Sequence, residues 1–125
     1  YPDDMEVQDL SFPGPNNGQT IPVRWYRPGH APSPSPVILY FHGGGFTLGD
    51  LDSSDTQAWG IAQRTGVHVI SVDYRLAPEH PFPAAPEDVY AVLQQVSLKG
   101  SSMDIDASRV GTWGDSAGGC LSAAL

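Results

Sequence analysis

Alternating and continuous runs of apolar residues divide the chain into strand-like and helix-like segments. Residues 7–12 (VQDLSF) and 21–26 (IPVRWY) alternate between apolar and polar positions, as half-buried strands do. The turn-forming sequence PGPNNG at 13–18 separates them, which predicts a β-hairpin. Further on, PVILYFH at 36–42 and VHVISVDY at 67–74 are continuous apolar runs, typical of strands buried on both faces. The pattern therefore predicts four strands in this part of the chain.

Helical periodicity appears between and after the two apolar strands. Residues 52–66 begin with polar capping residues, carry apolar residues at helical spacing and end in a glycine. Residues 85–98 place apolar side chains along one helical face. We expect a last strand over 108–115 (SRVGTWGD) and a last helix from Ser116 onward.

The order of these elements, ββ followed by βαβαβα, indicates an α/β fold. Strands that alternate with helices are joined by right-handed crossovers and build a mostly parallel sheet, to which the first two strands add an antiparallel N-terminal hairpin. The connector PGHAPSPSP at 28–36 suits a surface loop better than a linker between domains. A single domain is therefore expected, with its ligand site at the carboxyl ends of the strands.

Composition narrows the class of partner. The 125 residues include 14 Asp and Glu against 6 Lys and Arg, a formal net charge of −8. This charge argues against nucleic acids and anionic membrane surfaces, since both require a basic face. It suits a neutral or cationic partner, or serves solubility alone. No apolar run reaches the roughly 20 residues of a membrane span, and the single cysteine, Cys120, rules out an internal disulfide.

The sequence GDSAGG at 114–119 fits the pattern G-x-S-x-G. Its glycines let a strand turn sharply into a helix, which exposes the hydroxyl of Ser116 at a helix N-terminus. Backbone N–H groups and the helix dipole favour a developing negative charge there. A Gly/Ser turn without chemistry fits the motif alone equally well, but the strand predicted before it and the helix predicted after it favour a nucleophile.

The sequence HGGGF at 42–46 directly follows a predicted strand. Glycines let backbone N–H groups approach a substrate oxygen closely. Two N–H groups of this loop and that of Ala117 would form an oxyanion hole with three donors. A phosphate-binding loop is the rival interpretation, and it fails because there is no G-K-[ST] and because Leu48 breaks the pattern G-x-G-x-x-G.

A third motif, DYRLAPEHPFPAA, occupies residues 73–85. Together, HGGGF, DYRLAPEHPFPAA and GDSAGG, in this order and at these separations, resemble the hormone-sensitive-lipase-like carboxylesterases of the α/β-hydrolase fold. The resemblance covers roughly residues 21–125 and implies that Ser116 is the acyl-accepting nucleophile. It further implies that residues 74–85 support the HGGGF loop at 42–46, called the glycine loop below. The other implied roles are oxyanion N–H donors at Gly44, Gly45 and Ala117, and loop support from His42 and Gly43.

A serine nucleophile needs a general base and an acid that orients the base. In this fold the order along the chain is serine, then acid, then histidine, whereas all four histidines here precede Ser116. We therefore expect residues 1–125 to be the N-terminal part of a single α/β-hydrolase domain. This part is expected to be incomplete, and not to fold alone, without a C-terminal polypeptide that carries the acid and the His.

The expected activity is that of a serine carboxylesterase acting on small neutral acyl esters with short chains. No cofactor is expected. No metal site is expected either, because Asp104 and Asp106 suit the capping of a turn before the last strand better than a cation loop. Three alternatives stay open. These are a catalytically dead, receptor-like protein that binds a small molecule, an amidase or lactonase of the same fold, and an inert fragment.

Overall fold

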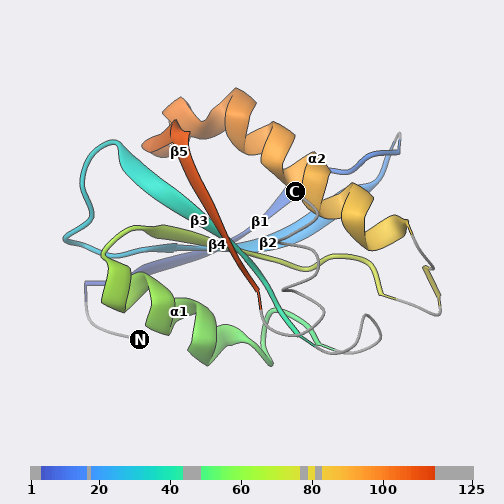
Figure 1. The fold of residues 1–125 in the computed structure, drawn as a ribbon, viewed down its shortest axis with the longest axis horizontal. Helices are drawn as coiled ribbons and strands as arrows, with labels where there is room; N and C mark the ends of the chain where they lie inside the picture. The colour runs from blue at the N-terminus through green and yellow to red at the C-terminus, as the bar shows by residue number, and fades with distance from the viewer. Residues whose placement is uncertain (1–3, 17, 44–48, 77–78, 81–82, 115–125) are drawn as a thin grey trace.

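The computed structural model describes residues 4–16, 18–43, 49–76, 79–80 and 83–114, which form a sheet with helices on both faces (Figure 1). The strands within these ranges are β1 (Glu6–Pro13), β2 (Thr20–Arg27), β3 (Ser35–Phe41), β4 (His68–Val72) and β5 (Ile105–Gly114). The helices within them are α1 (Asp55–Thr65), α2 (Ala84–Lys99) and a short 3-10 helix (Gly100–Met103). Neither α-helix is long and apolar enough to cross a bilayer.

The described strands form one mixed sheet in the order β1-β2-β4-β3-β5. The pairs β1–β2 and β2–β4 are antiparallel, whereas β4–β3 and β3–β5 are parallel. Among these strands β2 alone therefore runs against the other four. The α/β fold, the mostly parallel sheet and the antiparallel N-terminal hairpin predicted from the sequence are confirmed.

Each face of the sheet carries its own apolar core, because successive side chains of a strand point to opposite faces. The α1 face buries Tyr26, Tyr40 and Val69 against the helix. The α2 face buries a larger cluster, in which Leu39 and Ile70 come from the same central strands. Strands β3 and β4 serve both cores, which is why their sequences are continuous apolar runs rather than alternating ones.

Two predicted element starts, those of α1 and β5, differ from the observed ones by three residues. Helix α1 starts at Asp55 rather than residue 52, because Asp50 and Ser53 bond to each other and fold the preceding residues into a turn. Its end is confirmed, since Gly66 adopts φ +70° and its N–H donates to the Ala62 carbonyl.

Strand β5 starts at Ile105 rather than residue 108, because Ile105 already pairs with Ser35 across an irregularity in register. The placement of Asp106 in a turn before the strand was therefore wrong. Its carboxylate accepts the Ser108 N–H at 3.0 Å within β5. Asp104 does lie in a turn, with φ 59° at the end of the 3-10 helix.

A buried carboxylate fastens α2 to the segment that follows β4. Asp88 is fully buried and accepts hydrogen bonds from the Arg75 backbone N–H at 2.9 Å and from Arg75 Nε at 3.0 Å. Gln19 Nε2 lies 3.4 Å from the same carboxylate, which extends the link to the start of β2. The charge of Asp88 is thus compensated without access to water.

A buried histidine lies at the amino ends of the central strands. His68 begins β4 and is 4% exposed, and its Nδ1 accepts a hydrogen bond from Trp25 Nε1 at 3.2 Å. That bond requires an unprotonated Nδ1. Burial is the main cause that lowers the pKa of His68; the charge of Asp104 opposes it, and the charge of Arg27 adds a smaller lowering effect. This environment indicates a structural role for His68 in the core.

The lowered pKa of His68 predicts a pH dependence of stability. As pH falls below the unfolded-state pKa of about 6.5, the unfolded chain takes up a proton that the folded chain refuses. We therefore expect the free energy of unfolding to fall between about pH 7 and pH 5. The variant His68→Asn keeps an acceptor for Trp25. In this variant the free energy of unfolding, measured by denaturant titration of the full-length protein, should depend less steeply on pH. Equal slopes would contradict this interpretation.

The buried pair of Asp88 and Arg75 predicts a large loss of stability when it is broken. Asp88→Ala leaves the Arg75 guanidinium and backbone N–H without their acceptor, and should lower the free energy of unfolding by about 3 kcal/mol. The matched control is Asp106→Ala, which removes a surface pair with the half-exposed Arg109 and should cost about 1 kcal/mol or less. The free energies of unfolding are measured by chemical denaturation. Equal losses in the two variants would contradict the conclusion that the buried pair contributes more to stability than the surface pair.

Candidate active site

The three sequence motifs begin at one edge of the sheet, because the central strands end in register. Phe41, the last residue of β3, pairs with Val72 at the end of β4 and with Gly114 at the end of β5. The motif HGGGF starts one residue after Phe41, and DYRLAPEHPFPAA one residue after Val72. GDSAGG starts at Gly114 itself. Motifs far apart in the sequence are therefore neighbours at the carboxyl ends of parallel strands.

Several predicted site residues lie outside the described ranges. They are the nucleophile candidate Ser116 and the oxyanion candidates Gly44, Gly45 and Ala117. Of the predicted loop support, His42 and Gly43 are described. The described part of the candidate site is therefore the edge of the sheet at which these motifs begin.

The side chain of His42 is buried and held on two sides. Its ring is 2% exposed and stacks on the Tyr74 ring, with 4.3 Å between centroids and 12° between planes. Its Nδ1 lies 2.8 Å from the Gly43 carbonyl. Because a carbonyl only accepts, this contact assigns the proton to Nδ1. The Nε2 atom of His42 is buried without a hydrogen-bond partner among the described side chains and backbone.

Tyr74 ties the segment after β4 to the start of the glycine loop. Its hydroxyl donates to the His42 carbonyl at 2.6 Å. Burial raises the pKa of Tyr74 to about 12, so the phenol keeps its proton near neutral pH. Both the ring and the main chain of His42 are thereby fixed to the neighbouring segment.

Asp73 adds a titratable group at the same edge. It lies between β4 and Tyr74, and its backbone N–H donates to the Pro22 carbonyl at 3.0 Å. Burial raises the pKa of its carboxyl, and His42 partly offsets that effect. Sequence analysis did not single out Asp73, although it is the first residue of the third motif.

The base of the glycine loop is closed by Gly49. This residue adopts φ +102°, a conformation that side chains disfavour. A Cβ atom placed there would collide with His42 Nδ1 and lie 2.7 Å from the Gly43 carbonyl oxygen. Gly43 and Gly49, which flank residues 44–48, therefore lie close together at the base of the loop. The sequence analysis missed this role, for which a glycine directly before a predicted helix start is the available signal.

A compact turn over residues 50–54 follows Gly49. The Asp50 carboxylate accepts the Ser53 N–H at 2.7 Å, and Ser53 Oγ accepts the Asp50 N–H at 3.0 Å. Ser54 Oγ donates to the Asp50 carbonyl at 2.8 Å. The bond from the Ser53 backbone is the main cause that lowers the pKa of Asp50. Reciprocal bonds of this kind make the turn a rigid unit.

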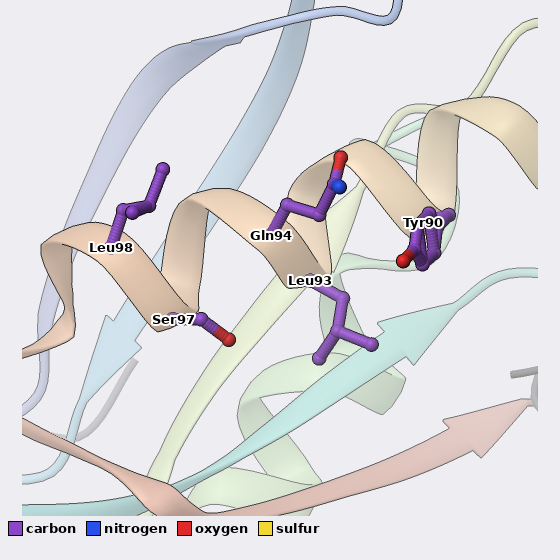
Figure 2. A pocket seen from close by; sticks show the side chains of 5 residues that line it. All are labelled: Tyr90, Leu93, Gln94, Ser97 and Leu98. Carbon is purple, nitrogen blue, oxygen red and sulfur yellow. The ribbon is translucent and has the colours of Figure 1, made fainter.

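Two hollows on the described surface differ in their setting. One of about 240 Å³ lies between the glycine loop and the start of α1, lined by Tyr40, His42, Gly43, Ser53, Ser54 and Gln57. A larger groove of about 340 Å³ is lined by α2 side chains alone (Figure 2). Only the smaller hollow lies where the motifs begin, so it belongs to the candidate site and the groove on α2 does not.

The remaining histidines lie away from this edge or are engaged locally. His68 starts β4 and His30 precedes β3, which places both at the amino ends of the strands. His30 lies 3.6 Å from Asp4. The His80 backbone N–H donates to the Leu76 carbonyl at 2.8 Å. In the part of the chain that the structure describes, no group of three His, Cys, Asp or Glu side chains could hold a metal ion.

Comparison with known proteins identifies a matching family and similar esterases. Residues 38–125 match a family described by the alpha/beta hydrolase fold. The chain is 44% identical to esterase LipI of Mycobacterium tuberculosis, covering 98% of this chain and 38% of LipI. It is 43% identical to an ethyl acetate hydrolase of Pseudomonas putida, covering 95% of this chain and 38% of that enzyme.

Solved structures agree with these relatives. The crystal structure of esterase LipW from Mycobacterium marinum is 45% identical, with a TM-score of 0.89 over 95% of this chain and 37% of LipW. The chain thus spans less than two-fifths of the length of each of these three proteins. By its sheet, its family match and its esterase relatives, the chain belongs to the α/β-hydrolase family, among the hormone-sensitive-lipase-like carboxylesterases.

Proposed function

We propose that the chain supplies the nucleophile and the oxyanion hole of a serine carboxylesterase. The observation that carries the proposal is the register of Phe41 with Gly114, which starts the glycine loop and the serine motif side by side. The esterase names of LipI, LipW and the ethyl acetate hydrolase support the same reaction class.

In the proposed mechanism, Ser116 Oγ attacks the ester carbonyl carbon while its proton passes to a histidine base. The negative charge that develops on the carbonyl oxygen is accepted by the backbone N–H groups of Gly44, Gly45 and Ala117. Collapse of the tetrahedral intermediate breaks the ester C–O bond, and the alcohol leaves with the proton from the base. Water then attacks the acyl-enzyme with help from the same base, which releases the acid and restores Ser116.

His42 acts in this proposal as support for the loop rather than as the base. Its Nδ1 proton is engaged by the Gly43 carbonyl, and its ring is stacked on Tyr74. Its Nε2 atom is buried rather than exposed to solvent. The histidine base and its acid are assigned to polypeptide outside residues 1–125.

Two exposed surfaces suit this further polypeptide. Strand β5 pairs with β3 on one side, and Trp113 on it is 44% exposed. On the α2 groove, Tyr90 is 51% and Leu98 is 75% exposed. Sheet edges and apolar helix faces of this kind are normally covered within a domain. We infer that the remainder of the hydrolase domain covers them, which agrees with relatives more than twice as long as this chain.

The proposed substrates are neutral esters with short acyl chains. The net charge of −8 disfavours anionic substrates. One relative is named for ethyl acetate, a small neutral ester. No cofactor takes part in the proposed steps.

Labelling with a fluorophosphonate tests the nucleophile. This reagent modifies a serine only where a base and an oxyanion hole activate it. In the full-length protein, we expect one label on the peptide that contains Ser116, found by mass spectrometry. Ser116→Ala should abolish the label and lower ester hydrolysis by at least about 10³-fold. Ser108→Ala, which alters an exposed serine on β5, should change neither.

The outcomes separate the competing functions. Labelling together with hydrolysis of p-nitrophenyl acetate would establish the esterase, and a preference for anilides or lactones would replace it with an amidase or a lactonase. A folded, full-length protein without label or hydrolysis would contradict the proposal and favour a binding protein that has lost its base.

A further inference from the structure

A single arginine on β2 joins three parts of the fold beside the candidate site. Arg24 is 13% exposed at its side chain. Its Nε contacts the Asp9 carboxylate on β1 at 2.7 Å, and its Nη2 contacts Asp52 at 2.9 Å. Its Nη1 contacts Asp55 on α1 at 3.3 Å and the Leu51 carbonyl at 3.4 Å. The guanidinium therefore bonds one strand, one turn and one helix at the same time.

Arg24 is held most closely by Asp9 on β1. Asp9 takes two bonds from Arg24, through Nε and through Nη2 at 3.2 Å, which fixes the plane of the guanidinium against β1. The remaining N–H groups then point toward residues 51–55. These bonds raise the pKa of Arg24 and lower that of Asp9, so both stay charged near neutral pH. A lysine ammonium cannot reproduce this planar set of donors.

The turn transmits the position of Arg24 to the glycine loop. Leu51 and Asp52 lie inside the turn over residues 50–54, which the bonds between Asp50 and Ser53 make rigid. Gly49 directly precedes the turn and packs on His42 and the Gly43 carbonyl. A displacement of the turn therefore displaces Gly49 against the base of the loop.

The loop has two anchors, and Arg24 controls one of them. On the side of β3, Tyr74 holds His42 through its hydroxyl and its ring. On the side of α1, the turn is held by Arg24, and Tyr26 adds a bond to Asp55 at 2.5 Å. Two of the three N–H groups proposed for the oxyanion hole, those of Gly44 and Gly45, belong to residues between these two anchors in the sequence.

We propose that Arg24 is a positioning residue for ester hydrolysis, which aims the oxyanion N–H groups by fixing the base of the glycine loop. This inference rests on the proposed function of that loop. Arg24 touches neither substrate nor the reacting atoms. Its effect should therefore appear in the stabilisation of the transition state and not in the binding of the ground-state ester.

The test compares Arg24→Gln with Arg27→Gln in the full-length protein. Arg27 is the matched control, because it lies on the same strand, pairs with Glu6 at 2.8 Å and lies 4.2 Å above the Trp25 ring. The side-chain hydrogen bonds of Arg27 go to Glu6 and Gln8 on β1 rather than to the turn, and its loss removes the same charge. For each variant, kcat is measured per active site, as counted by titration with the fluorophosphonate, so that unfolded molecules do not contribute.

In Arg24→Gln we expect kcat to fall by about 10- to 100-fold with KM nearly unchanged, since small misplacements of catalytic groups have effects of this size. Affinity for a trifluoromethyl ketone, which forms an oxyanion on Ser116, should fall in parallel, whereas affinity for the matched methyl ketone should not. Arg24→Lys should recover only part of kcat. Arg27→Gln should keep kcat per active site within about twofold of the unaltered protein.

Amide hydrogen exchange of the peptide spanning residues 43–49 gives a readout that does not depend on catalysis. We expect faster exchange in Arg24→Gln than in Arg27→Gln. If Arg24→Gln fails to fold, Asp52→Ala tests the same link, because the Asp52 side chain is 88% exposed and its loss leaves Arg24 paired with Asp9.

The results distinguish this inference from the proposed function. Unchanged kcat per active site and unchanged exchange in Arg24→Gln would overturn the positioning role. An equal loss of kcat in Arg27→Gln would overturn it as well, because the effect would then be one of general stability. If the unaltered protein hydrolyses no ester, the proposed function fails, and the exchange measurement alone decides whether Arg24 holds the loop.

Discussion

The arrangement of the candidate site depends on the position of β3 between β4 and β5. Because β3 pairs with β4 on one side and with β5 on the other, and all three end in one row, Phe41 has Val72 and Gly114 as its neighbours. A shift of either pairing by two residues would move one motif by about 7 Å relative to the others. The apolar cores on both faces oppose such a shift, since it would carry buried side chains past the helices that cover them. The chemistry at the edge therefore depends on the packing of the sheet.

Carboxylates near the starts of the two helices extend this control to the loops. Asp55 in the first turn of α1 binds Arg24 and Tyr26 of β2. Asp88 near the start of α2 binds Arg75, just after β4. The start of α1 is thereby attached to β2, and the start of α2 to the segment that follows β4. Helix packing and loop position are thus coupled on both faces.

The sequence predicted most of the fold, because strand and helix periodicity are local properties of the chain. It predicted the start of α1 less well, since polar residues before a helix fit either a cap or a separate turn, and here the bond between Asp50 and Ser53 makes the turn. It also missed the first residues of β5, where Asp106 does not resemble a strand residue. The links from Arg24 to Asp52 and from Arg75 to Asp88 join residues distant in sequence. No local pattern indicates such links, so these parts of the site required the structure.

A loop that offers only backbone N–H groups as donors cannot be held by its own side chains. Glycines give it close access to a substrate oxygen, but they also give it more conformational freedom than any other residue. The restraint must then come from the two ends of the loop, and both ends converge on His42. Tyr74 holds its ring and its carbonyl on one side, and Gly49 packs against its Nδ1 on the other. A histidine whose ring is buried and stacked in this way suits a role in holding the loop. The proposed division of labour agrees with this restraint: in the proposed mechanism His42 holds the base of the loop, and a different histidine carries the proton.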